Sequence, residues 1–158
     1  MKVVIASDSH GRNDKLDTIY EDFKDEVQLF LHLGDLESDP DYVPDWICVV
    51  GNRYSHRRHE MGSVKIVEAG SHKILMQHGH RYPAGEREVM IAQEAKEKGC
   101  DIALYGHTHV PFDQVIDGVR VINPGSLSRP KNMSRAGFMI MDLTDDGIDV
   151  SRFAQNCI

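Results

Sequence analysis

Cysteine is scarce in this sequence. The 158 residues include only three, Cys48, Cys100 and Cys157, which are widely spaced and form no Cys-x-x-Cys pair. An odd number without paired spacing argues against a disulfide framework and against a zinc site built from thiolates. Because no segment resembles a secretory signal either, we expect a cytoplasmic protein.

Long apolar runs and clustered basic residues are also lacking. No stretch approaches the roughly 20 apolar residues that a membrane-spanning helix needs. Lys and Arg number 18 against 25 Asp and Glu, which gives a formal net charge of −7. Binding of nucleic acid through counterion release requires clustered Lys and Arg. We therefore expect neither a membrane nor a broad nucleic-acid surface as a partner.

What the chain does have is an ordinary globular composition with many histidines. Its length fits one domain, residues 1–158, which can bury roughly two thirds of its unfolded surface. With 41% hydrophobic and 27% charged residues, disorder, collagen-like repeats and coiled coil are disfavoured. The nine histidines leave three alternatives open, namely metal ligands, acid–base groups and surface residues.

Strand-length apolar runs alternate with helical patterns through the first two thirds of the chain. Apolar residues recur at i, i+3, i+4 and i+7 from Leu16, which predicts a helix capped by Asn13 or Asp14. A second helix is predicted over residues 85–98, with Gly99 as its C-terminal stop. Strands that alternate with helices indicate an α/β fold. The apolar runs lie at residues 3–6, 29–33, 46–50, 74–76 and 102–105.

The last third favours antiparallel hairpins. Asp117-Gly118 separates two short apolar segments and is a strong two-residue turn signal. Residues 144–147 separate two longer apolar segments, 138–143 and 148–153, in the same way. Such pairs imply a mixed sheet or two packed sheets.

A chemically useful side chain follows each of the five apolar runs. If these runs are parallel neighbours, their carboxyl ends share one sheet edge, which is where open α/β sheets bind ligands. Four of the five sites place a glycine beside the functional residue, and glycine permits tight turns and close backbone approach. The segments are Asp8-Ser9-His10, Gly34-Asp35, Gly51-Asn52, His78-Gly79-His80 and Gly106-His107-Thr108-His109.

Oxygen and nitrogen donors without cysteine favour divalent ions such as manganese, iron or zinc. Seven donors exceed the needs of one tetrahedral ion and suit two ions that share a carboxylate, for which Asp35 is the natural bridge. Two such ions (+4) with Asp8 and Asp35 (−2) leave a local charge of +2, which would attract a phosphate ester. Paired ions roughly 3.5–4 Å apart generate a hydroxide nucleophile and stabilise phosphoryl oxygens.

Taken singly, the segments have simpler explanations. Asp8-Ser9-His10 alone is a helix-capping loop, and Gly34-Asp35 or Gly51-Asn52 alone is a turn dipeptide. The paired histidines are more specific, because histidine pairs after a strand are seldom needed for packing. Since all five strands end in this way, coincidence is a poor explanation.

These segments resemble, in order, the D-x-H, G-D, G-N, H and G-H-x-H blocks of the calcineurin-like binuclear metallophosphoesterase family. The segment Asn123-Pro124-Gly125-Ser126 is also similar, and the short length resembles the small single-domain bacterial and archaeal phosphodiesterases. The resemblance implies a four-layer αββα sandwich of two mixed sheets, with the metal site at the carboxyl edge of the strands. It also implies a metal-dependent phosphodiesterase that acts on small phosphate esters.

The resemblance further implies a ligand set for two divalent ions, with manganese expected and nickel, iron or zinc as alternatives. The first ion would bind Asp8, His10, Asp35 and His109. The second would bind Asp35, Asn52, His78 and His107.

One residue departs from the family pattern. Many members have histidine directly after the asparagine, where it acts as a general acid or orients the phosphate, but this chain has Arg53. Arginine does not release a proton at ordinary pH, so Arg53 can hold a phosphate oxygen but not protonate a leaving group. The general acid is thus unassigned, and we expect a preference for good leaving groups such as aryl phosphodiesters.

Other polar residues are weaker candidates for substrate binding. Residues 53–59 are locally basic, His80 and Arg81 follow the fourth run, and Arg129 follows Ser126. A solvated loop or a simple turn explains these residues as well, and His80 is equally suited to support a metal-bound histidine. His32, inside an apolar run, is expected to be a buried core histidine.

Two other functions compete with the phosphodiesterase. One is a non-catalytic interaction scaffold of the retromer-subunit type, which shares the fold; its members tend to lose the histidine at position 10, which this chain retains. The other is a phosphomonoesterase for a phosphoprotein or nucleotide, against which Arg53 argues mildly. Chain length leaves a homo-oligomer open.

Overall fold

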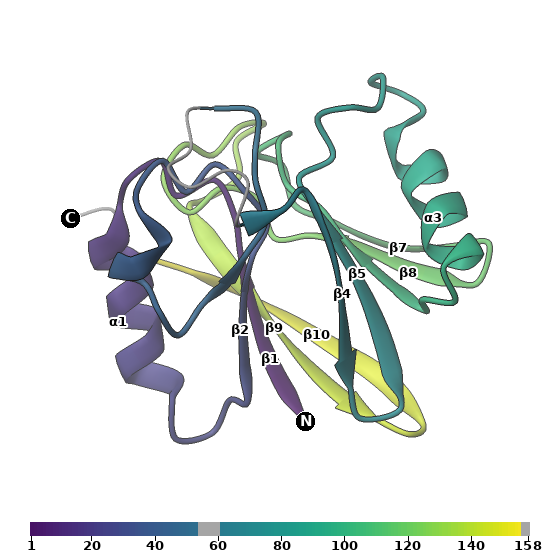
Figure 1. The fold of residues 1–158 in the computed structure, drawn as a ribbon, viewed down its shortest axis with the longest axis horizontal. Coiled ribbons are helices and arrows are strands. Elements are labelled where there is room, and N and C mark those ends of the chain that lie inside the picture. Colours follow the sequence, from purple (N-terminus) through teal and green to yellow (C-terminus); the bar gives the residue numbers. More distant parts are fainter. Residues whose placement is uncertain (54–60, 156–158) are drawn as a thin grey trace.

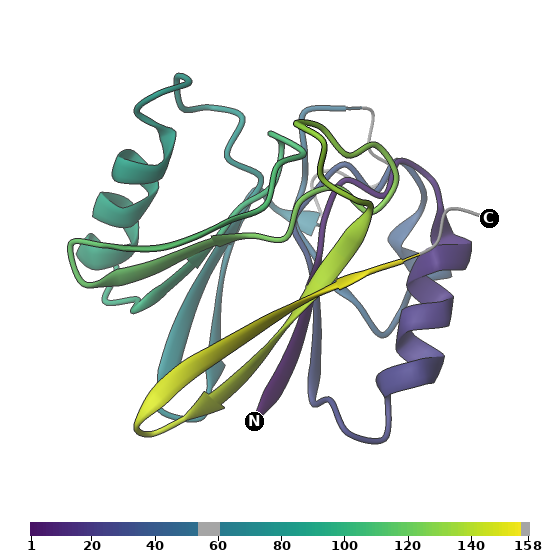
Figure 2. The same ribbon diagram turned by 180° about the vertical axis from the view of Figure 1, so that it is seen from behind.

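The computed structural model describes residues 1–53 and 61–155. Within these ranges two five-stranded sheets lie face to face, with α1 outside one sheet and α3 outside the other (Figures 1 and 2). The predicted αββα sandwich is therefore confirmed. In chain order the elements are β1 (Lys2–Ala6), α1 (Asn13–Phe23), β2 (Leu29–His32), the 3-10 helix η1 (Pro40–Tyr42), β3 (Ile47–Cys48), β4 (Val64–Ala69), β5 (His72–Gln77), α3 (Arg87–Glu97), β6 (Ile102–Leu104), β7 (Phe112–Ile116), β8 (Val119–Asn123), β9 (Gly137–Thr144) and β10 (Gly147–Ala154).

Both sheets are mixed. The first has the order β10-β9-β1-β2-β3, and the second has the order β4-β5-β6-β8-β7. Strand β1 pairs in parallel with β2 and antiparallel with β9, so this early strand lies in the middle of its sheet. In the second sheet β5, β6 and β8 are parallel, and β4 and β7 are antiparallel edge strands. Both predicted hairpins are present, as β7–β8 and β9–β10.

The main core lies between the two sheets. Val3 and Leu31 of the first sheet belong to the same buried cluster as Ile74, Leu104 and Ile122 of the second. The outer face of each sheet is covered as well, by α1 on one side and α3 on the other. Because both faces of the central strands are covered, these strands read as continuous apolar runs in the sequence.

The five apolar runs are divided between the two sheets. The shared edge was inferred on the condition that the runs are parallel neighbours, but the first three belong to one sheet and the last two to the other. Their carboxyl ends still meet, because the two sheets pack with these ends at the same side of the sandwich, at the top of Figure 1. The shared edge is therefore a seam between two sheets.

The predicted helix caps also differ. Helix α1 begins at Asn13, and its N-cap residue Arg12 makes no side-chain capping bond. Asn13 instead accepts a hydrogen bond from Ser38, and Asp14 binds the Arg12 guanidinium. Helix α3 starts at Arg87, later than expected, while Gly99 with φ +74° follows its end as predicted. No helix in the described ranges is long and apolar enough to cross a membrane.

Candidate metal centre

The loops after β1 and β2 run side by side. The Asp8 amide donates to the Gly34 carbonyl and the His10 amide to the Asp35 carbonyl, each at 3.0 Å. These bonds extend the parallel pairing of the two strands beyond their ends. As a result Asp8, His10 and Asp35 project from adjacent positions at the seam.

The second sheet contributes its histidines across the seam. His78 directly follows β5, and its Nδ1 atom lies 2.8 Å from the Leu33 carbonyl of the first sheet. The His107 amide donates to Asp8 Oδ2 at 3.1 Å. These two contacts therefore fix the position of one sheet relative to the other at the point where the proposed ligands meet.

Three of the histidines have their Nδ1 atoms anchored outside the centre. Nδ1 of His78 faces Leu33 O, Nδ1 of His109 faces Arg129 O at 2.6 Å, and Nδ1 of His10 faces the Glu37 carboxylate. Since these oxygens accept, the proton belongs on Nδ1 and the unprotonated Nε2 atom points inward. Metal-binding histidines are commonly oriented in this way.

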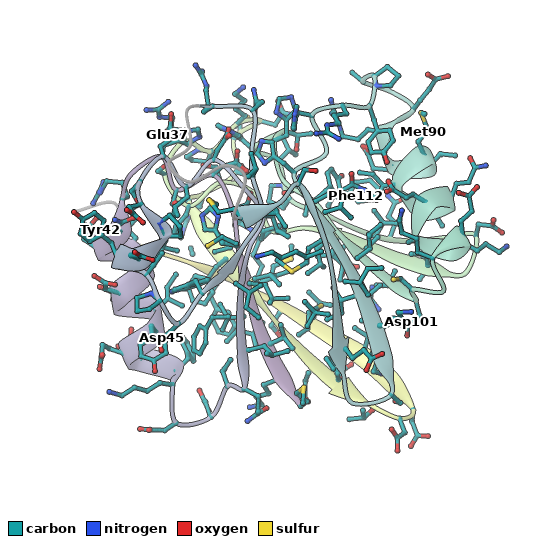
Figure 3. The ribbon with its side chains drawn as sticks, in the orientation of Figure 1. Glu37, Tyr42, Asp45, Met90, Asp101 and Phe112 are labelled. Atoms are coloured by element: carbon teal, nitrogen blue, oxygen red, sulfur yellow. The ribbon has the colours of Figure 1, made fainter. Side chains whose placement is uncertain are left out.

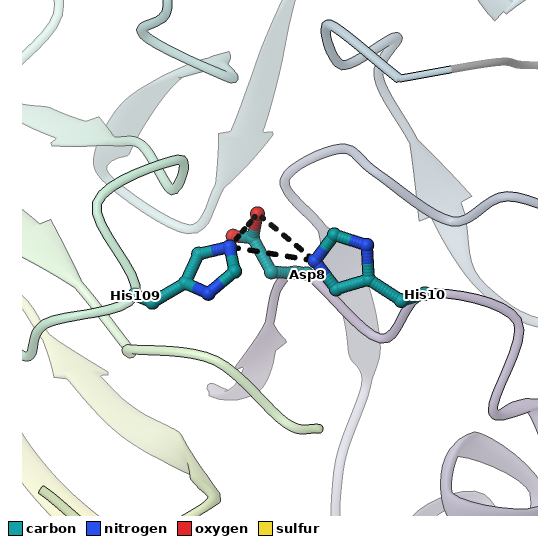
Figure 4. Close-up of side chains that lie close together, drawn as sticks. All are labelled: Asp8, His10 and His109. Atoms are coloured by element: carbon teal, nitrogen blue, oxygen red, sulfur yellow. Dashed lines mark hydrogen bonds and ion pairs between the residues drawn. The ribbon is translucent and has the colours of Figure 1, made fainter. Parts of the chain in front are cut away.

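The inward-facing atoms form two adjacent groups. In the first, Asp8 Oδ1 lies 3.2 Å from His109 Nε2 and 3.9 Å from His10 Nε2, as drawn in Figure 4. In the second, His78 Nε2 lies 3.4 Å from Asp35 Oδ2 and 3.8 Å from Asp8 Oδ1. Within each group the potential ligand atoms all lie within 4.8 Å of one another.

Asn52 joins the second group to the last predicted ligand. Its Oδ1 atom lies 2.9 Å from His78 Nε2 and 3.2 Å from His107 Nδ1. All seven side chains that the sequence singled out thus form one connected cluster. Asp8 belongs to both groups in this arrangement, and the bridging role of Asp35 stays a prediction.

A buried oxygen in the cluster fits a bound cation. Asp8 is fully buried, yet its Oδ1 atom accepts no hydrogen bond among the described residues. Leaving a carboxylate oxygen in this state is costly unless a charge or a donor compensates it. The atom lies at the centre of the two groups and faces histidine nitrogens, so a divalent ion at this position would satisfy it.

The backbone of the cluster is unusually strained. Left-handed conformations are rare for residues other than glycine and cost of order 1–3 kcal/mol each. Five of the seven proposed ligands adopt one, as does Glu37. The φ angles are 54° at Asp8, 48° at His10, 56° at Asp35, 68° at His107, 62° at His109 and 56° at Glu37. Such clustering of strain is typical of functional sites.

Two of the neighbouring glycines are required by close packing. A Cβ atom on Gly51 would overlap the Asp35 carboxylate, and one on Gly34 would lie 2.5 Å from His78 Nδ1. The motif glycines therefore leave space for the side chains that the cluster brings together.

The neighbouring charges keep both carboxylates ionised. Burial alone would raise the pKa of Asp8, but His109, His78 and Ser7 together lower it. Burial would likewise raise the pKa of Asp35, and His78 together with the Arg53 amide lowers it well below its usual range. Ionised carboxylates are the form that binds cations.

The histidines divide into two classes. Burial lowers the pKa of His107 to about 4, helped by the charge of His78. His109 has a raised pKa because of its contact with Asp8. Burial opposes the charged form of His78, but Asp35 and Asp8 outweigh it and raise the pKa. His107 is thus neutral and ready to bind a metal over the whole physiological pH range.

A pocket of about 210 Å³ opens directly onto the cluster. Arg53 and Arg129, two of the weaker sequence candidates, line it. Lys131 also lines it and was missed by the sequence analysis. The pocket is lined by His10, Asp35, Asn52, Arg53, His107, His109, Arg129 and Lys131.

The other weak candidates lie elsewhere. His80 packs beside the cluster, with its ring centroid 5.5 Å from that of His78. His80 and Arg81 line a separate small cavity rather than the main pocket. Residues 54–59 of the basic segment lie outside the described residues. His32 is a buried core histidine, as predicted, bonded to Ser9 and to the Gly34 amide.

Comparison with known proteins decides the family. The calcineurin-like phosphoesterase superfamily domain matches residues 1–146. The chain belongs to the calcineurin-like phosphoesterase superfamily. The chain resembles the probable metallophosphoesterase YsnB of Bacillus subtilis, with 32% identity over 98% of this chain and 92% of the relative. It is 27% identical to the phosphodiesterase MJ0936 of Methanocaldococcus jannaschii, over 79% and 83% of the two chains.

Solved structures share the fold of this member of the superfamily. A predicted phosphoesterase from Streptococcus pneumoniae superposes with a TM-score of 0.87 at 26% identity, covering 97% of this chain and 88% of that one. Vps29 of Chaetomium thermophilum has a TM-score of 0.76 at 16% identity, covering 97% of each chain, which shows the fold alone.

Proposed function

We propose that this metallophosphoesterase is a phosphodiesterase that hydrolyses small phosphate esters at a centre of two divalent ions. The observation that carries the proposal is the buried Asp8 Oδ1 atom, which has no hydrogen-bond donor among the described residues and faces three inward-pointing histidines. One ion would be held by Asp8, His10, Asp35 and His109. The other would be held by Asp35, Asn52, His78 and His107.

The donor set matches the chemistry of the proposed ions. Histidine nitrogens with carboxylate and amide oxygens suit manganese, iron, nickel and zinc, and manganese is the expected ion. When bound, two such ions supply an activated water and neutralise phosphoryl charge during displacement.

The protein itself supplies orientation and charge. The unprotonated Nε2 atoms of His10, His78 and His109 are fixed in place by the acceptors on their Nδ1 atoms. Arg53 and Arg129 line the pocket over the centre. Their guanidinium groups are suited to hold non-bridging phosphate oxygens.

The position of Arg53 favours diesters with good leaving groups. Arg53 directly follows Asn52, and its amide donates to Asp35 Oδ1 at 3.0 Å, so the residue is fixed beside the centre. A guanidinium cannot protonate a departing alkoxide. An aryl phosphodiester, whose leaving group needs no proton, is therefore the substrate expected to turn over best.

The proposal is tested by metal content together with hydrolysis. The purified protein should contain a divalent metal, and with added Mn²⁺ it should hydrolyse bis(p-nitrophenyl) phosphate faster than p-nitrophenyl phosphate. Asp35→Asn and His109→Ala should abolish this activity, whereas Asp117→Asn, at an exposed turn residue that does not line the pocket, should not. Absence of both metal and turnover would refute the proposal.

The same measurements separate the competing functions. Bound metal without turnover on either ester would favour the interaction scaffold. Faster hydrolysis of the monoester would favour the phosphomonoesterase. Retention of His10 within contact distance of Asp8 and His109 supports an enzyme.

A further inference from the structure

Three cationic side chains line the pocket without engaging a carboxylate. They are Arg53, Arg129 and Lys131. Within residues 1–53 and 61–155, the side-chain nitrogens of these three residues take part in no ion pair or hydrogen bond. Arg129 and Lys131 come from one loop, on the side of the pocket that carries His109.

This loop is tied firmly to the metal cluster. The Arg129 carbonyl accepts from His109 Nδ1 at 2.6 Å, and the Lys131 amide donates to the His109 carbonyl at 3.1 Å. The Arg129 amide also donates to Ser126 Oγ, which itself donates to the Asp8 carbonyl. The two cations are therefore carried on backbone that is fixed relative to the proposed ligands.

The loop turns sharply just after the cations. Asn132 and Met133 both adopt left-handed conformations, with φ of 53° and 60°. Consecutive strained residues other than glycine are uncommon and occur mainly in functional segments. The turn directly follows Lys131, so both cations precede it on the segment that is bonded to His109.

The charge of the pocket exceeds what one phosphodiester needs. Two divalent ions (+4) with Asp8 and Asp35 (−2) give +2, and a phosphodiester carries −1, so the centre alone already exceeds the charge of the scissile group by +1. Arg129 and Lys131 add +2 on one side. Binding sites generally complement the charge of their ligands. A substrate with a second anionic group would supply the missing negative charge.

We propose that Arg129 and Lys131 form a subsite for a second phosphate group, so that the substrate is a phosphodiester that also carries a terminal phosphate. This inference rests on the proposed phosphodiesterase function. The fixed loop places the subsite beside His109, and guanidinium with ammonium is a pairing well suited to a phosphate dianion.

The test uses two diesters with the same leaving group. One is thymidine 5′-(p-nitrophenyl phosphate), and the other is the same compound with an added 3′-phosphate. Calorimetry on the Mn²⁺-loaded protein at low temperature, where turnover is slow, measures binding of both, and release of p-nitrophenol with Mn²⁺ measures kcat/KM. We expect the 3′-phosphorylated compound to be preferred by roughly tenfold or more, because charge-assisted hydrogen bonds stabilise its extra phosphate.

The variants assign that preference to the loop. In Arg129→Gln/Lys131→Gln the ratio of the two kcat/KM values should fall to about one, because the charged hydrogen bonds to the extra phosphate are lost. Arg135→Gln removes a charge from the same loop outside the pocket and should retain the preference.

Each other outcome has a definite meaning. Equal binding of both compounds by the wild-type protein, or a preference that survives in the double variant, would overturn the subsite. Equal weakening of both compounds in the double variant would also overturn it, because the cations would then hold the scissile phosphate. A binding preference without any hydrolysis of either compound or of bis(p-nitrophenyl) phosphate would leave the subsite standing and refute the proposed function instead.

Discussion

The Nδ1 atom of His10 lies 2.5 Å from Oε2 of Glu37. An ionised carboxylate only accepts hydrogen bonds, so this contact fixes the proton on Nδ1 and leaves Nε2 to face Asp8 and His109. Glu37 follows Asp35 by two residues and lies among the polar side chains at the top of Figure 3. It therefore orients a proposed metal ligand without contacting the metal position itself.

Replacing this carboxylate should weaken metal binding. Glu37→Gln keeps the size of the side chain but removes the negative charge that strengthens His10 as a donor. We expect the affinity for Mn²⁺ to fall by roughly 10- to 100-fold, measured by calorimetry on the metal-free protein. Glu97→Gln, on the exposed surface of α3, is the matched control and should bind Mn²⁺ like the wild type. Equal affinities in the two variants would contradict the role of Glu37.

Gly51 should not tolerate even one added methyl group. A Cβ at this position would overlap the Asp35 carboxylate and backbone, so Gly51→Ala must shift a proposed ligand. We expect a loss of about 1–3 kcal/mol in the free energy of unfolding and weaker Mn²⁺ binding. Gly147→Ala, where a Cβ meets nothing within 4 Å, provides the control in both denaturant unfolding and calorimetry. Unchanged metal binding in Gly51→Ala would show that the contact is unimportant.

Arg53 should limit the hydrolysis of monoesters. Arg53→His places a titratable group beside Asn52, where it can protonate a leaving group near neutral pH. We expect monoester turnover to rise by about tenfold or more, in line with the usual contribution of general acid catalysis. The rate on an alkyl phosphomonoester such as glycerol phosphate, whose leaving alkoxide needs a proton, is compared with the rate on bis(p-nitrophenyl) phosphate, both with Mn²⁺, and the ratio measures the change. A ratio that does not move would remove the argument that a missing acid sets the preference.

His72 lies at the opposite edge of the sandwich and should make the free energy of unfolding depend on pH. Its Nδ1 lies 2.6 Å from Asp101 Oδ2, and its Nε2 lies 2.6 Å from the Thr144 carbonyl of the other sheet. Burial lowers the pKa of His72, but these two contacts, with the charges of Asp101 and Asp145, outweigh it and raise the pKa. The doubly protonated ring is therefore favoured in the folded state.

The sign of the effect follows from that direction. A raised folded-state pKa stabilises the protein fully below the unfolded value of about 6.5, and the contribution is lost as pH rises through the folded-state pKa. The difference in unfolding free energy between wild type and His72→Gln should thus be larger at about pH 6 than at about pH 8.5. Urea denaturation measures both. Asp101→Asn should reduce the same pH dependence, and a constant difference across pH would contradict the assignment.

Much of the cluster could be predicted because each ligand is marked locally. Asp8, Asp35 and His78 follow apolar runs, and buried strands read clearly in a sequence when both sheet faces are covered. The partition of those strands between two sheets could not be read in the same way. Nothing local distinguishes a parallel neighbour in one sheet from a strand facing it across the core.

The other features that the sequence did not predict have weak local patterns or depend on tertiary contacts. Edge strand β4 contains the charged residues Lys65 and Glu68 and is exposed along much of its length, so its apolar signal is weak. Asn13 was expected as a helix cap, but Ser38 occupies its side chain through a contact that only the tertiary structure creates. Lys131 reaches the pocket through a loop bonded to His109, which lies 22 positions earlier in the chain. Glu37 was open to prediction, since carboxylates commonly support metal-binding histidines.

The central position of β1 has a consequence for synthesis on the ribosome. Its two neighbours are β2, made soon afterwards, and β9, Gly137–Thr144. Because chains emerge from the N-terminus, one edge of β1 stays open until nearly the whole described chain has been made. Asp8 is thus translated before every other proposed ligand, yet its strand is among the last to be closed on both sides. A nascent chain halted before β9 would carry all seven ligands with an incomplete first sheet.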